Sequence, residues 1–133
     1  MKPAQFIGYT LLNASAITNI TSTRINNGTR PNGEIVPCIN YFQISGNRFY
    51  GMENALYSIN CRANDPIQAR DIAREVVSLF AGTSGQGVYG TQNGFTVSRA
   101  SLSNDAGLIP EPDDDIYNAP VDILIVYPGN TVS

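Results

Sequence analysis

Three glycines in the stretch SGQGVYGTQNG, residues 84–94, have the spacing G-x-G-x-x-G, which in some proteins cradles a dinucleotide pyrophosphate. They are Gly85, Gly87 and Gly90. Such a site needs a strand before the glycines and a helix after them, because the pyrophosphate sits on the helix N-terminus. Here the pattern predicts a helix that ends before the glycines and a strand that begins near Phe95. The order is reversed and no Lys-Ser/Thr pair follows, so we expect no cofactor.

Carboxylates gather once, at Glu111, Asp113, Asp114 and Asp115, within a proline-rich turn. A solvated loop is the simplest interpretation. A shared cation, or an arginine contact across a subunit boundary, is the alternative, because hard cations take carboxylate oxygens. The sequence has no histidine, so neither a Ser-His-Asp nor a Cys-His arrangement can be built. We therefore predict that the protein is not an enzyme.

The two cysteines, Cys38 and Cys61, lie in two apolar strand patterns that predict an antiparallel hairpin. If Ser45 faces Asn54, then Cys38 faces Cys61, with β-carbons about 4.5–5.5 Å apart. A redox pair or half of a metal site is one interpretation. Two small buried thiols in a reducing compartment is the interpretation we favour. Without histidine or a second C-x-x-C, a zinc site has too few ligands.

Composition points to one small domain, residues 1–133, with an unusually uncharged surface. Only 14% of residues are charged, against about 25% in typical soluble domains. Other subunits often cover such a surface. The net charge is −3 and no basic run occurs, which argues against tight nucleic-acid binding. The N-terminal apolar run is too interrupted for a signal peptide and too short to span a bilayer, so we expect a cytoplasmic chain. The N-glycosylation sequons in the sequence should therefore stay unmodified.

Periodicity predicts an α+β fold: a mostly antiparallel or mixed sheet with two helices packed on one face. The helices are expected at residues 3–14 and 65–82, the second with Asp65 as N-cap, Pro66 in the first turn and Gly82 at its end. The strands are expected at residues 24–26, 35–45, 53–63, 94–103 and 121–128, the last buried on both faces. The connection 82–94 exceeds the usual helix-to-strand length. We expect it to be poorly ordered in a free subunit and ordered against a partner.

The order of these blocks resembles the tail-terminator, or tail-completion, proteins of long-tailed bacteriophages. TRINNGTRPNGEIVPCINYFQIS resembles the family's opening, YSINCRANDPIQARDIAREVVSLFAG its strand and capped helix, and DDDIYNAPVDILIVY its closing turn and strand. The resemblance covers nearly the whole chain in the right order. The long Gly-rich connection at 82–94 departs from the family, where it is often shorter.

The resemblance implies a ring, typically a hexamer, that caps the tail tube, ends its polymerisation and offers a surface for docking the head. Its partners would be copies of itself, the tail-tube protein and the head-tail connector of the neck. DNA would pass through the lumen without specific binding, and no membrane would be involved. The protein would assemble in the host cytoplasm and reside in the virion. Another structural protein of the neck or tube is the first alternative, and a small binding module that uses the Gly-rich loop is a distant one.

Ten residues are candidates for contacts with other subunits, the tail or the neck. They are Gly85, Gln86, Gly87, Val88, Tyr89, Gly90, Asp113, Asp114, Asp115 and Arg30.

Overall fold

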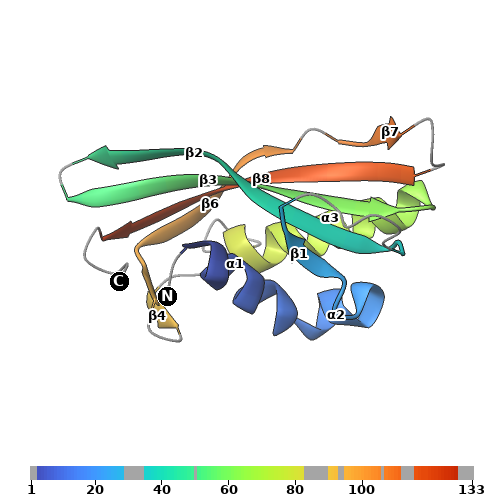
Figure 1. The fold of residues 1–133 in the computed structure, drawn as a ribbon, viewed down its shortest axis with the longest axis horizontal. Coiled ribbons are helices and arrows are strands. Elements are labelled where there is room, and N and C mark those ends of the chain that lie inside the picture. The colour runs from blue at the N-terminus through green and yellow to red at the C-terminus, as the bar shows by residue number, and fades with distance from the viewer. Residues whose placement is uncertain are drawn as a thin grey trace.

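The computed structural model describes residues 3–28, 35–49, 51–82, 90–92, 95–105, 107–111 and 116–128, and these contain three helices and eight strands (Figure 1). The helices are α1 (Pro3–Leu12), α2 (Ser15–Thr21) and α3 (Pro66–Ala81). The strands are β1 (Ile25–Asn27), β2 (Cys38–Phe49), β3 (Met52–Ala63), β4 (Gly90–Gln92), β5 (Phe95–Val97), β6 (Arg99–Asp105), β7 (Ile109–Glu111) and β8 (Ile116–Pro128). The predicted α+β class is confirmed.

One mixed sheet organises the molecule, in the order β1-β2-β3-β8-β6. Strand β1 runs parallel to β2, and the other pairs are antiparallel. Strand β8 is paired along both sides, with β3 on one and β6 and β7 on the other. Strands β4 and β5 form a separate two-stranded ladder. The three helices lie on one side of the main sheet, below it in Figure 1, where two helices were predicted.

Helix α3 follows its local signals closely. Asp65 is the N-cap, and its carboxylate accepts a hydrogen bond from the Ile67 N–H at 3.0 Å. Pro66 occupies the first turn, and Gly82 ends the helix with φ 73°, a conformation that glycine adopts without strain. The apolar stripe, including Ile72, Val76 and Phe80, is buried against the sheet. The bounds and the capping residues of this helix agree with the sequence prediction.

The predicted N-terminal helix of residues 3–14 is wrong at its end, because the chain breaks there and starts a second helix. Helix α1 ends at Leu12, and α2 begins at Ser15 without a side-chain cap on Ala14. The α2 sequence SAITNIT is rich in β-branched residues, which have low helix propensity. Burial of Ile17 and Thr21 stabilises α2 instead, and packing of this kind is not visible in the local sequence.

The predicted hairpin exists, but its predicted register is wrong. Cys38 pairs with Arg62 and Ile39 with Cys61, so the two cysteines do not face each other. Consecutive residues of a strand point to opposite faces, so the two buried thiols lie on opposite sides of the sheet. The register then shifts between Gln43 and Ser45, where a bulge inserts an extra residue. The strands also continue through the predicted loop, as far as the pair formed by Phe49 and Met52.

The core lies between the sheet and the helices. Phe6 of α1 stacks on Phe95 of β5 with ring centroids 5.0 Å apart, and Phe95 contacts Tyr127 of β8 at 5.2 Å. Strand β8 buries alternate residues, including Val121, Ile123 and Ile125, whereas the residues between them are half-buried. The prediction that β8 is buried on both faces is therefore wrong. One face of the sheet packs on the helices, and the other carries no helix (Figure 1).

Candidate assembly surfaces

Most residues predicted from the sequence to make contacts lie outside the described part of the chain. These are Arg30, Gly85, Gln86, Gly87, Val88, Tyr89, Asp113, Asp114 and Asp115. Gly90 is described, and it is the first residue of β4, paired with Val97 of β5. The end of the Gly-rich segment thus belongs to a strand, which corrects its interpretation as loop throughout. The expected flanks are confirmed: α3 ends before the glycines and strands follow them.

The outer half of β2 is the most exposed part of the described sheet. Strand β1 covers only Ile39, Asn40 and Tyr41 of β2. From Phe42 to Arg48 every side chain is exposed, and among the described residues no strand pairs with the outer edge. We call this segment the β2 edge. In Figure 1 it extends to the left, past α1.

Two large apolar side chains of the β2 edge face solvent. Phe42 is 43% exposed and Ile44 is 49% exposed. Ile44 is the extra residue at the bulge. Monomeric proteins usually protect such edges with charges, prolines or a covering element. An edge that exposes two large apolar side chains is therefore a candidate contact surface.

Strand β6 forms the opposite edge of the sheet. It pairs with β8 on one side and, within the described residues, with no strand on the other. Leu102 is 41% exposed, and Arg99, Ser103 and Asn104 are also exposed. We call Arg99–Asp105 the β6 edge. The two edges are therefore mainly uncharged, and each exposes at least one large apolar side chain.

A small ionic group anchors the far end of the β2–β3 hairpin. Arg48 donates to one carboxylate oxygen of Glu53 through Nη2 at 2.6 Å and Nε at 3.1 Å. The hydrogen bond from Arg48 lowers the pKa of Glu53, and the Tyr127 hydroxyl contributes a second bond. Burial raises the pKa of Tyr127 to about 12, and the negative charge of Glu53 adds to the shift. Because Arg48 already has a carboxylate partner, it protects the β2 edge only weakly.

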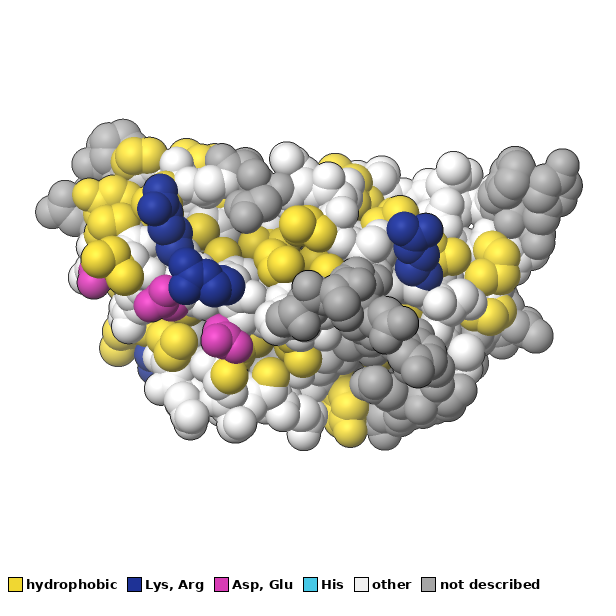
Figure 2. Space-filling model, turned by 180° about the vertical axis from the view of Figure 1, so that it is seen from behind, with side chains coloured by type: hydrophobic (Ala, Val, Ile, Leu, Met, Phe, Trp, Pro, Cys, Tyr) yellow, Lys and Arg dark blue, Asp and Glu magenta, His cyan; other side chains and the backbone are white. Residues whose placement is uncertain are grey.

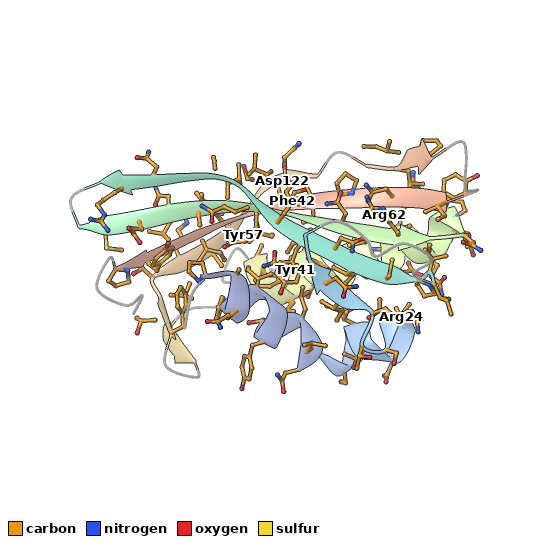
Figure 3. All side chains as sticks on the ribbon, viewed as in Figure 1. Arg24, Tyr41, Phe42, Tyr57, Arg62 and Asp122 are labelled. Atoms are coloured by element: carbon orange, nitrogen blue, oxygen red, sulfur yellow. The ribbon has the colours of Figure 1, made fainter. Side chains whose placement is uncertain are left out.

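Polar side chains cross the helix-free face of the sheet at its other end (Figure 3). The Arg62 guanidinium donates to Asn40 Oδ1 at 2.5 Å, and Asn118 Nδ2 donates to Asn60 Oδ1 at 2.9 Å. Asn40, Asn60 and Asn118 are all buried. Asn40 Nδ2 and Asn118 Oδ1 nevertheless have no hydrogen-bond partner among the described residues. Each costs stability, because a buried unpaired polar atom loses its hydration without compensation.

The helix side carries the charged residues of α3 and a shallow cavity. In Figure 2 acidic and basic side chains gather toward the left, over α3, and a further basic group lies toward the right. Arg74 lies 3.5 Å from Asp71 in an exposed ion pair. A cavity of about 360 Å³ is lined by Arg70, Ala73, Arg74, Val77, Gly107 and Ala119. Two arginines suit an anionic group, but the described residues bring no other polar side chain to this cavity.

Among the described residues, no group of three or more His, Cys, Asp or Glu side chains could hold a metal ion. No helix within the described part of the chain is long and apolar enough to cross a membrane. The features that remain are edges and faces of the sheet. The sequence hinted at one of them, because Phe42 and Ile44 are apolar strand residues, but strand periodicity does not tell a buried face from an exposed one.

Comparison with known proteins reveals similarity of fold alone. No protein-family model matches the chain, and no curated protein sequence matches it. Among solved structures, the chain is similar to one from the virion of a native gene transfer agent (GTA) particle, with a TM-score of 0.57 and 10% sequence identity. The match covers 92% of this chain and 92% of that one. The two chains therefore share an entire α+β architecture.

Proposed function

We propose that this protein is a structural component of a virion, and that it acts as a tail terminator. Copies would form a ring, with six as the expected number, on the last ring of tail-tube subunits. The observation that carries the proposal is the β2 edge, which is exposed on both faces and unpaired within the described residues. The fold shared with a virion chain over 92% of its length supports the broader part of the proposal, a structural component of a virion.

The mechanism is surface complementarity. The ring would stop addition of tube subunits at one end and present its other end to the head-tail connector of the neck. A heterologous contact, in which different patches of each copy meet, closes into a ring when the rotation between copies is a whole fraction of a turn. The net charge of −3 suits a lumen through which DNA passes without binding.

The test uses the full chain and the tail-tube protein of the same virus. Native mass spectrometry and electron microscopy of the purified protein should show a closed ring, either alone or after addition of tubes. Added during tube polymerisation, the protein should cap the tubes and stop their growth. A stable monomer that never binds tubes would refute the proposal. Incorporation along the tube, instead of at its end, would favour a tube subunit.

The Gly-rich segment is a proposed contact of this ring with its neighbours. Because Gly90–Gln92 pair with β5, a deletion that tests the segment must spare them. Deletion of residues 84–89 should leave the unfolding midpoint of the protein nearly unchanged and impair ring formation or tube capping. Unchanged assembly would mean that the segment is only a spacer.

A further inference from the structure

The two sheet edges that have no strand partner among the described residues match each other in length and position. Strand β6 has seven residues, and the β2 edge from Phe42 to Arg48 is equally long. Three rungs of directly paired residues run across the sheet between them. They are Phe42 with Ser58, Asp122 and Asn104; Ser45 with Leu56, Leu124 and Ser101; and Asn47 with Asn54, Val126 and Arg99. The two edges therefore occupy the same level along the strand direction.

The strand directions match as well. Between β2 and β6 lie β3 and β8, and each of the three successive pairings is antiparallel. Strand β2 is therefore antiparallel to β6 within one copy. Rotation about an axis parallel to the strands leaves the strand directions unchanged. A second copy rotated in this way therefore presents its β2 edge antiparallel to the β6 edge of the first. No shift along the strands is needed, and Ser45 of one copy then faces Ser101 of the other.

We propose that the β2 edge of one copy pairs with the β6 edge of the next, so that neighbouring sheets join through backbone hydrogen bonds. The inference rests on the proposed ring and specifies how its subunits meet. Phe42 and Leu102, which are 43% and 41% exposed in the single chain, lie on opposite faces of the sheet, and each gains a neighbouring strand at this junction. The charges do not oppose the pairing, since Arg99 faces Asn47 and Arg48 is held by Glu53. The two edges differ from each other, so the contact is heterologous and can close.

A disulfide between Ser45→Cys and Ser101→Cys tests this geometry. Within one copy these positions are separated by β3 and β8, which places them about 14 Å apart at the usual strand spacing. A disulfide requires α-carbons within about 7 Å, so it can form only between copies. Both native cysteines are buried, and the unmodified chain controls for their reaction. Under mild oxidation, the double variant should give a covalent ladder up to the full ring on a non-reducing gel.

Three controls make the outcome specific. Ser45→Cys combined with Asn104→Cys places the second thiol two rungs away, about 7 Å along the strand, and should cross-link much less. Neither single variant should form dimers alone, whereas a mixture of the two should form only dimers. Dimers of Ser45→Cys alone would indicate that β2 pairs with itself and would overturn the proposal. If the protein forms rings but the double variant gives no covalent ladder, the proposed edge pairing is wrong and the proposed function stands. If no ring forms at all, the proposed function itself fails.

Discussion

Gly8 of α1 lies directly against the hydroxyl group of Tyr41 on β2, so close that a β-carbon at residue 8 would overlap the phenol oxygen. Tyr41 is only 7% exposed and forms part of the core, so its ring has little room to retreat. Glycine lowers the helix propensity of α1 by about 1 kcal/mol relative to alanine. The close approach of helix and sheet therefore takes precedence over helix propensity at this position.

Gly8→Ala should destabilise the protein although it favours the helix. Overpacking of a core costs about 1–3 kcal/mol, which exceeds the gain in helix propensity. Chemical unfolding of the variant checks the sign. In a Tyr41→Phe background, which lacks the phenol oxygen, Gly8→Ala should cost much less free energy of unfolding than it does in the natural chain. A stabilising effect of Gly8→Ala would contradict the packing of α1 on β2.

Charge placed on the β2 edge should block assembly without harming the fold. Phe42→Lys and Ile44→Lys alter side chains that are already 43% and 49% exposed, so the free energy of unfolding should change by less than about 0.5 kcal/mol. A lysine on an unpaired strand edge opposes pairing with another chain. Native mass spectrometry should show loss of rings. Ile67→Lys on α3, at a residue 67% exposed and distant from the edge, is the matched control and should assemble normally.

Asn60→Ala should weaken the fold through a buried hydrogen bond. Asn60 Oδ1 accepts from Asn118 Nδ2, and Asn118 Oδ1 already has no partner among the described residues. The substitution leaves both polar atoms of Asn118 unpaired, at a cost of about 1–3 kcal/mol. Urea unfolding measures the loss. Asn104→Ala, at an exposed position, is the control and should change stability by less than about 0.5 kcal/mol.

Two tyrosines should make the protein sensitive to base. Burial raises the pKa of Tyr57 and of Tyr127 to about 12, from the ordinary value of 10.0. A phenol with a raised pKa in the folded state keeps its proton more tightly there than in the unfolded chain. Its contribution to stability is therefore complete below pH 10 and is lost as the pH rises toward 12. Within that window, ionisation of each tyrosine lowers the free energy of unfolding by as much as about 1.4 kcal/mol per pH unit.

Tyr57→Phe removes one of these titrations, so the variant should lose stability less steeply between pH 10 and 12. The Tyr57 hydroxyl donates to Gln43 Oε1 at 3.4 Å, and loss of this hydrogen bond lowers stability at every pH. Urea unfolding at pH 8, 10 and 11 separates that constant loss from the pH-dependent slope. Equal slopes for the variant and the natural chain would mean that the Tyr57 phenol titrates alike in the folded and unfolded states.

The local sequence determined the elements whose signals lie within a few residues. Helix α3 could be placed from Asp65, Pro66, Gly82 and an apolar stripe, because caps and periodicity act within one or two turns. The α+β class and the β2–β3 hairpin followed from the same kind of pattern.

The tertiary structure alone decided the features that depend on contacts between distant residues. The β2–β3 pairing begins with Phe49 and Met52 and shifts by one residue at Ile44, and both faces of β3 are substantially buried, so alternation could not select the register. Helix α2 forms through burial of Ile17, against its own propensity. The two unpaired edges arise because β1 is short and β6 is last in the strand order, and strand order is a property of the whole sheet. Local sequence patterns therefore could not predict the surfaces available for assembly.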